Sequence, residues 1–207
     1  MFIIGMTGGI ASGKSAVSFV LKKFGAQVMD IDEVTHELLL PSGTLFEIYI
    51  RHFGKYVLGA DGQLNKKIIG EIIFNHADER AWINSVAHPI LLNYTRDFLV
   101  NCANIGCKLA VVEVPLLFEA GWEFLFDEIW AVHVPRAKQI WRLCQRDKIT
   151  YQQAIARVKA QMPVEEICAR ADVVINNQKS RASIQRQVIK ALKGRFSYNQ
   201  GGVAFVL

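Results

Sequence analysis

The chain has 207 residues, of which 51% are hydrophobic and 21% are charged. This balance is typical of a globular protein with a substantial core and excludes an intrinsically disordered chain. The formal net charge of +5 comes from 24 Lys and Arg residues spread along the sequence. A small polyanionic substrate therefore explains the charge as well as a nucleic acid does.

Cysteine spacing and hydropathy indicate where the protein is located and whether it uses zinc or disulfides. No signal-peptide pattern and no apolar run of about 18 residues occur, which predicts a cytoplasmic protein without a membrane span. The cysteines form no C-x-x-C pair and no zinc-binding spacing. We expect reduced thiols in or near the core at Cys102, Cys107, Cys144 and Cys168.

The N-terminal residues predict a βαβ unit. Phe2–Thr7 is a short apolar run, typical of a buried strand, and Gln27–Asp32 is predicted as a second strand that ends in two aspartates. Gly25 is expected to end the helix between them. The apolar residues of that helix recur at helical spacing and are Val17, Val20, Leu21 and Phe24.

The pattern is helical from Glu33 to about Cys107, with no strong strand signal. The sheet resumes in Lys108–Glu119, whose apolar run indicates a strand buried on both faces, and continues in Glu128–Val134 and Asp172–Asn177. Helices are predicted between and after these strands, one of them opening on a capping box at Thr150 and Gln153 and the next at Pro163. The last seven residues predict no element.

One segment between the first strand and the first helix reads G-x-x-x-x-G-K-S. Such a loop wraps phosphates with its backbone N–H groups, its lysine reaches the β- and γ-phosphates, and its serine hydroxyl binds Mg²⁺. A strand before it and an amphipathic helix after it separate this motif from a chance match. The predicted nucleotide-binding residues are Gly8, Gly9, Ile10, Ala11, Ser12, Gly13, Lys14 and Ser15.

Carboxylates follow the second and third strands. Asp30 and Asp32 lie two apart, so in an extended chain they share a face at the strand end where ligands of α/β sheets bind. Each could accept a proton or cap the next helix. Glu113 lies inside an apolar run, so it is expected to face the phosphate and metal edge or to pair with a cation, whereas Glu119 is expected to be exposed.

Arg142 and Arg146 lie four apart on one face of a predicted helix. Arginines there could stabilise charge during phosphoryl transfer, as in a lid, or could form an ordinary solvated basic face. His88 precedes a proline in the helical region, and its chemistry alone does not distinguish it from a structural histidine.

Taken together, these features resemble the dephospho-CoA kinases, small P-loop kinases that phosphorylate the ribose 3′-hydroxyl of dephospho-CoA. The resemblance runs from about Ile4 to Leu192. It is carried, in the family's order, by "GMTGGIASGKS", "VMDIDEVTHELL" with "PSG", "DGQLNKKIIGEIIF", "HPIL", "VVEVPLLFEAG", "RLCQRD" and "ARADVVINN".

The resemblance implies an α/β fold of three parts. A nucleotide-binding core with a three-layer parallel sheet would comprise residues 1–32, 105–140 and 171–207, a helical CoA-substrate domain residues 33–104, and a helical lid residues 141–170. ATP and Mg²⁺ are the implied cofactors. Dephospho-CoA is the implied small-molecule partner, with no nucleic acid, no membrane and a monomer favoured.

The same resemblance assigns roles to particular residues. Asp32 matches the catalytic base, Lys14 and Arg142 stabilise the transferred phosphoryl group, and Ser15 holds the metal. Arg146, Asn176 and Asn177 would contact the nucleotide, and Asp32, His88 and Glu113 would contact the acceptor. The sequence departs from the family pattern at Ala11, where glycine is commonest, and at Ile31, which replaces the usual small residue between the aspartates. The segment "VHVPR" after the fourth strand is also slightly atypical.

Three alternatives remain at this point. Another small-molecule P-loop kinase, acting on a nucleoside monophosphate or a sugar acid, would share the core and the lid but would not need "HPIL" and "PLLFE" together. A regulatory GTPase needs a guanine-reading N-K-x-D, and "NNQK" at 176–179 lacks the aspartate. A nucleic-acid binder would have to explain why the basic residues are scattered.

Overall fold

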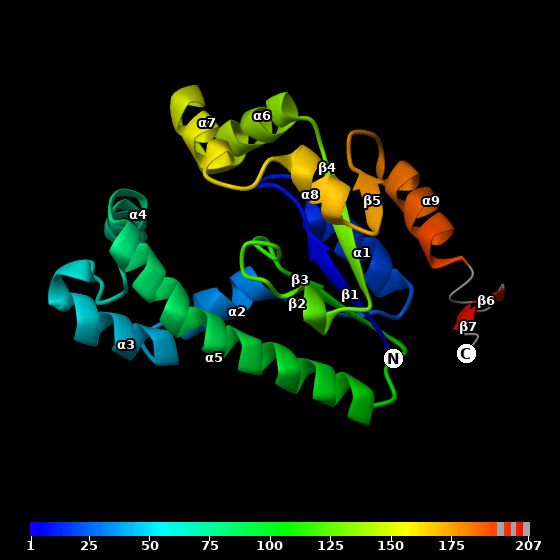
Figure 1. Ribbon diagram of the computed structural model, residues 1–207, viewed down its shortest axis with the longest axis horizontal. Helices are drawn as coiled ribbons and strands as arrows, with labels where there is room; N and C mark the ends of the chain where they lie inside the picture. Colours follow the sequence, from blue (N-terminus) through cyan, green and yellow to red (C-terminus); the bar gives the residue numbers. More distant parts are fainter. Residues whose placement is uncertain (194–196, 200–201, 205–207) are drawn as a thin grey trace. The chain divides into compact units, whose positions relative to one another are not determined.

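The computed structural model describes residues 1–193, 197–199 and 202–204 (Figure 1). The strands are β1 (Phe2–Thr7), β2 (Gln27–Asp30), β3 (Leu109–Glu113), β4 (Glu128–His133), β5 (Val173–Asn176), β6 (Ser197–Asn199) and β7 (Gly202–Ala204). The α-helices are α1 (Lys14–Lys23), α2 (Ile31–Leu38), α3 (Thr44–Phe53), α4 (Lys66–Asn75), α5 (Ala77–Asn104), α6 (Arg136–Asp147), α7 (Tyr151–Lys159), α8 (Val164–Arg170) and α9 (Arg181–Leu192). Short 3₁₀ turns are η1 (Lys55–Val57) and η2 (Glu123–Leu125).

The chain forms two compact units. One comprises residues 1–29 and 99–207, and the other residues 30–98. We call the first the sheet unit and the second the helical unit. The division into a core, a substrate domain and a separate lid over 141–170 stays a prediction, and its segment 171–207 includes residues 194–196, 200–201 and 205–207, which lie outside the described ranges.

The sheet unit is built on a five-stranded sheet in the order β2-β3-β1-β4-β5. β1 pairs in parallel with β3 and β4, and β4 pairs in parallel with β5. All five residues of β3 are buried, as expected for a strand covered on both faces. The predicted α/β fold with a parallel sheet is confirmed. A separate two-stranded antiparallel sheet pairs β6 with β7. β7 lies within the last seven residues, for which the sequence predicts no element.

Side chains alternate between the two faces of the sheet. Ile4 and Met6 of β1 and Trp130 of β4 point to the face on which α1 and α9 pack side by side (Figure 1). Gly5 points to the other face, where a Cβ atom would collide with the Phe126 ring. That glycine lets the segment after η2 pack directly on β1.

Helix α1 ends as predicted. Gly25 has a φ of 83°, in the left-handed region that glycine adopts without strain. Its N–H donates to the Lys22 carbonyl and the Ala26 N–H donates to the Leu21 carbonyl. These two bonds are those of a Schellman motif, which turns the chain toward β2.

The second strand is shorter than the sequence predicts. β2 ends at Asp30, and Ile31 already begins α2. The Asp32 N–H donates to the Asp30 carboxylate over 2.9 Å, so Asp30 is the N-cap of α2. The expectation that Asp30 and Asp32 share one face of an extended chain is therefore wrong, because the capping bond starts the helix between them.

Helices α2, α3 and α4 and most of α5 form the helical unit, and among its residues the structure has no strand beyond a single bridge between Leu58 and Leu64. An aromatic cluster joins α3 to α5. The Trp82 ring lies 5.4 Å from Phe53 and stacks on His52 at 3.5 Å between ring centroids. His52 also contacts the Glu79 carboxylate at 2.8 Å. This cluster gives the helices a shared core.

Candidate active site

The predicted phosphate-binding loop connects β1 to α1. Its last residues, Lys14 and Ser15, form the first turn of the helix, and Gly13 is the N-cap with a φ of 88°. The first N–H groups of a helix have no intrahelical acceptor and carry a partial positive charge. No acidic side chain lies in this first turn, so the loop and helix end are suited to an anion.

Glycine is favoured in the loop because side chains from other parts of the sheet unit approach its backbone closely. A Cβ atom on Gly9 would lie 2.6 Å from Nε2 of Gln139, a buried side chain of α6. A Cβ atom on Gly13 would collide with the Asn177 side chain. Both glycines therefore allow the Gln139 and Asn177 side chains to pack against the loop backbone.

Ala11, the departure from the family pattern, has a φ of 58° in the left-handed region. This conformation strains a residue that has a Cβ atom. Its methyl group packs against the small apolar cluster between α6 and α7, formed around Ile140, Leu143 and Ala154. The packing of the methyl group offsets part of the strain.

Arg142 and Asn177 hold the loop from two directions. Nη1 of Arg142 donates to the carbonyls of Ala11 at 3.2 Å and Ser12 at 3.0 Å, and its Nη2 donates to the Asn177 carbonyl at 3.1 Å. The Asn177 amide donates to the Ser12 carbonyl at 2.8 Å. Two of the predicted site residues are thus brought together with the loop, and the Arg142 guanidinium donates to backbone carbonyls.

Sequence reasoning missed a further support. Oε1 of Gln161, between α7 and α8, accepts the Ile10 N–H over 2.7 Å. The next residue, Met162, donates its N–H to the Glu119 carboxylate at 3.1 Å. Glu119 is exposed, as expected. Neither bond can be predicted from a local sequence pattern, because the partners are 151 and 43 residues apart.

Lys14 and Ser15 begin α1 directly after the loop. The Lys14 ammonium donates to the Gly8 carbonyl at 3.3 Å across the mouth of the loop. Ser15 is exposed at the start of α1, so its hydroxyl is accessible to a metal that also binds phosphate oxygens. Among the described residues no cluster of His, Cys, Asp or Glu forms a metal site by itself. A hydroxyl, phosphates and water fit Mg²⁺, which keeps much of its hydration shell.

Glu113 is buried at the last position of β3, with 4% of its surface exposed. The strand register aligns it with Met6, one residue before Thr7 and the loop. Next to it, the Val114 N–H donates to the Met6 carbonyl at 2.8 Å. The register therefore brings this carboxylate to the edge of the sheet from which the loop leaves.

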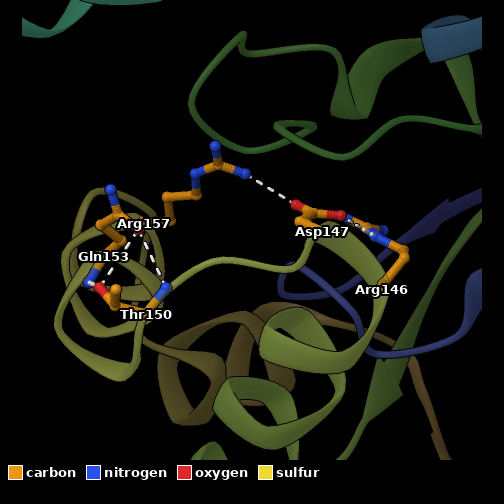
Figure 2. Close-up of polar contacts among 5 residues, drawn as sticks. All are labelled: Arg146, Asp147, Thr150, Gln153 and Arg157. Atoms are coloured by element: carbon orange, nitrogen blue, oxygen red, sulfur yellow. Dashed lines mark hydrogen bonds and ion pairs between the residues drawn. The ribbon is translucent and has the colours of Figure 1, made fainter.

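Arg146 lies at the end of α6, where it contacts the Asp147 carboxylate (Figure 2). Asp147 accepts hydrogen bonds from Arg146 at 2.7 Å and from Arg157 of α7 at 2.7 Å. The bond from Arg146 is the main reason that the pKa of Asp147 lies below its usual value, with the two guanidinium charges adding to it. The capping box predicted at Thr150 and Gln153 is present at the start of α7. These contacts fix the α6–α7 connection.

Asn176 differs from its neighbour Asn177. Its backbone N–H donates to Oε1 of Gln187 at 2.9 Å, and its carbonyl accepts from Nε2 of the same side chain at 3.0 Å. The backbone of Asn176 thus ties β5 to α9, whereas the side chain of Asn177 reaches the loop.

The predicted acceptor residues Asp32 and His88 belong to the helical unit. Asp32 is exposed in the first turn of α2 and lines a cavity within that unit. His88 is half-buried in α5, beside Pro89, and burial lowers its pKa from the usual value.

No helix within the described residues is long and apolar enough to cross a membrane.

Comparison with protein families gives a match over nearly the whole chain. The family model for dephospho-CoA kinase, CoaE, matches residues 2–183. A dephospho-CoA kinase of Carboxydothermus hydrogenoformans is 40% identical over 191 residues, which are 92% of this chain and 93% of that protein.

Solved structures agree with this match. The crystal structure of TT1252 from Thermus thermophilus has a TM-score of 0.79 and 30% identity, over 92% of this chain and 95% of that one. A dephospho-CoA kinase from Campylobacter jejuni has a TM-score of 0.64 and 26% identity, with the same two coverages.

Proposed function

The chain belongs to the dephospho-CoA kinase family, and from this premise we propose that it transfers the γ-phosphoryl group of ATP to the ribose 3′-hydroxyl of dephospho-CoA, giving coenzyme A and ADP. The observation that carries this proposal is the loop of residues 8–15 at the positive end of α1, whose backbone is hydrogen-bonded to Arg142, Asn177 and Gln161. Such a loop is suited to a nucleoside triphosphate.

The nucleotide would bind with its phosphates along this loop. Lys14 would exchange its bond to the Gly8 carbonyl for the β- and γ-phosphates, and Ser15 would hold Mg²⁺. When bound, Mg²⁺ neutralises charge on the phosphate oxygens. Because a phosphoryl transfer needs little covalent chemistry from the protein, positioning and charge stabilisation account for most of its catalysis.

Arg142 is proposed as the arginine closest to the transferred group. Its guanidinium already lies against the carbonyls of Ala11 and Ser12, so its charge is next to the loop. Asn177, bonded to the same carbonyl of Ser12, would support the nucleotide from the β5 side. Arg146, Asn176, His88 and Glu113 stay predicted contacts of nucleotide or acceptor.

Asp32 is the proposed general base. Its exposed carboxylate in the first turn of α2 would accept or orient the proton of the 3′-hydroxyl as that oxygen attacks the γ-phosphorus. The proton passes to the carboxylate, and the bond between the γ-phosphorus and the ADP oxygen breaks in line as ADP leaves.

The direct test incubates the protein with ATP, Mg²⁺ and dephospho-CoA and follows ADP together with the 3′-phosphorylated product. A folded protein that makes no product would overturn the proposed function. Nucleoside monophosphates and sugar acids offered as acceptors test the alternative kinases in the same assay. A monomeric state is predicted, and light scattering in solution checks it.

For Asp32 we predict that Asp32→Asn lowers kcat by about 100-fold or more, the usual contribution of a general base, and leaves the KM for ATP nearly unchanged. Glu33→Gln is the matched control, because it removes an exposed carboxylate from the same helical turn. If Asp32→Asn turns over at a near-normal rate with an intact fold, the assignment of the base is wrong.

A further inference from the structure

Two of the four cysteines meet at the end of α5. All four are free thiols, with Cys102 buried and Cys107, Cys144 and Cys168 half-buried. The Cys102 thiol forms a hydrogen bond with the Cys107 side chain, and the Cys107 thiol donates to the Leu109 carbonyl at 3.0 Å. The sulfur atoms of Cys102 and Cys107 are therefore neighbours.

The turn that ends α5 brings this pair together. The Cys107 N–H donates to the Cys102 carbonyl at 2.9 Å, and the Gly106 N–H donates to the Ala103 carbonyl at 3.0 Å. These are the two bonds of a Schellman motif, and Gly106 supplies its left-handed residue with a φ of 71°. In such a motif the two positions that are cysteines here are usually a pair of apolar side chains in contact. This chain places two thiols at that contact.

The separation of the two residues suits a disulfide. The bond of 2.9 Å between the Cys102 carbonyl and the Cys107 N–H, with standard backbone lengths, keeps the two Cα atoms within about 7 Å of each other. Disulfides usually join Cα atoms that are about 4.4–6.8 Å apart. The hydrogen bond between the side chains shows that both thiols point toward each other. A disulfide can therefore form while the turn stays in place.

The two thiols differ in their access to solvent. Cys102 is 3% exposed, and burial, with a smaller contribution from Cys107, raises the pKa of its thiol to about 11. At neutral pH Cys102 is therefore protonated, and a protonated thiol is not a nucleophile. Cys107 is half-buried, so a reagent in solution meets Cys107 first and Cys102 lies behind it.

We propose that Cys102 and Cys107 are a reversible redox site, which a low-molecular-weight disulfide oxidises to an internal disulfide. The Cys107 thiolate attacks one sulfur of the reagent R–S–S–R, and one R–S⁻ leaves, which gives a mixed disulfide. The Cys102 thiol then gives up its proton, its sulfur attacks the Cys107 sulfur, and the second R–S⁻ leaves. Two protein thiols are oxidised, the reagent disulfide is reduced, and the protons of the protein thiols end on two molecules of R–SH.

The disulfide closes a short loop at the point where the chain passes from α5 into β3, the strand that ends at Glu113. Such a link restricts the unfolded chain, whereas the folded turn already holds the two cysteines together. The oxidised protein is therefore expected to be more stable than the reduced protein, and a reductant is expected to reverse the change.

The first test incubates the full chain with oxidised glutathione and then blocks the free thiols without reducing the protein. Trypsin leaves both cysteines in one peptide, residues 97–108, because Arg96 and Lys108 are the cleavage sites and no Lys or Arg lies between them. Mass spectrometry should show this peptide without its thiol hydrogens and without glutathione, and dithiothreitol should restore both thiols. A peptide whose cysteines both remain free, or one that keeps glutathione, would contradict the proposal.

Variants test the order of the two steps. Cys102→Ala should keep glutathione bound to Cys107, because the thiol that displaces it is absent. Cys144→Ala, which removes a half-buried thiol of α6 outside the turn, is the matched control and should still form the internal disulfide. Equal amounts of bound glutathione on residues 97–108 of the wild type and of Cys102→Ala would mean that the two thiols react independently, and the proposal would be wrong.

A melting curve tests whether the disulfide fits the folded turn. Oxidation should raise the melting temperature of the wild type by roughly 4–8 °C and leave that of Cys102→Ala unchanged. An oxidised wild type that melts at or below the temperature of the reduced protein would show that the turn is strained by the link, which would overturn the proposal. Neither readout depends on catalysis, so these results are independent of the proposed function.

Discussion

At the scale of single residues, two opposing effects act on Ala11 of the phosphate loop, the strain of its backbone and the packing of its methyl group. Its φ of 58° places an alanine in the left-handed region, which costs about 1–2 kcal/mol relative to glycine. The same methyl group packs against the α6–α7 cluster, and burying one methyl contributes about 0.8 kcal/mol. The packing offsets part of the strain, which helps this chain keep an alanine where its family most often has glycine.

We therefore predict that Ala11→Gly changes the free energy of unfolding by less than about 1 kcal/mol and leaves kcat and the KM for ATP nearly unchanged. Urea unfolding and steady-state kinetics measure these quantities. Ala11→Val is the informative partner, because a β-branched residue in this conformation is strongly strained. A large change in ATP affinity on Ala11→Gly would show that the methyl group itself shapes the loop.

At the scale of elements, the connection between α6 and α7 depends on one carboxylate. Asp147 ends α6 and accepts hydrogen bonds from Arg146 and from Arg157 of α7 (Figure 2). Lys148 next to it has a φ of 54°, so the chain turns sharply before the capping box of α7. Since the α6–α7 cluster packs against Ile10 and Ala11, this connection also supports the loop.

The lowered pKa of Asp147 predicts a pH-dependent contribution to stability. A carboxyl whose pKa is lower when folded stabilises the protein above its unfolded pKa of about 3.9, and this contribution is lost as the pH falls through the folded pKa. Asp147→Asn should therefore lower the free energy of unfolding by about 1 kcal/mol at pH 7. The difference from wild type should shrink below about pH 4.

Denaturant unfolding from pH 7 down to the lowest pH at which the protein stays folded measures this difference. Asp97→Asn is the matched control, because Asp97 is exposed on α5 and has no hydrogen bond or ion pair to another described residue. A difference that stays constant with pH would mean that Asp147 acts through packing and not through its charge.

At the scale of the whole molecule, the loop is held by hydrogen bonds to distant parts of the sheet unit. Its carbonyls and N–H groups bond to Arg142 of α6, to Gln161 before α8 and to Asn177 after β5. A ligand that binds to this loop therefore binds to several elements of the fold at once. Because it binds only the folded chain, it should stabilise the unit as a whole.

We predict that a non-hydrolysable ATP analogue with Mg²⁺, at about 100 times its Kd, raises the melting temperature by roughly 5–10 °C. Lys14→Ala should remove most of this shift at the same concentration, because the ammonium that meets the β- and γ-phosphates is lost. Lys22→Ala, an exposed lysine at the other end of the same helix, should keep it. An equal shift in the wild type and Lys14→Ala would place the nucleotide elsewhere.

The sequence by itself determined the features that neighbouring residues encode. The phosphate loop, the buried strand around Val111, the helix end at Gly25 and the capping box at Thr150 depend on residues a few positions apart, so their pattern is readable without the fold. The order of the motifs, which is that of the dephospho-CoA kinases, also predicts the chemistry. The length of β2 is predicted wrongly because a capping bond from the Asp32 N–H to the Asp30 carboxylate outweighs the extended pattern.

The tertiary structure alone decided what holds the loop and what surrounds the acceptor residues. Gln161 meets Ile10 across 151 residues and Asn177 meets Ser12 across 165, separations over which no periodicity or motif specifies a partner. Asp32 is predicted at the end of a strand, whereas the structure places it in the first turn of α2, on the wall of a cavity. Such roles depend on which surfaces folding brings together, and interactions along the whole chain decide this.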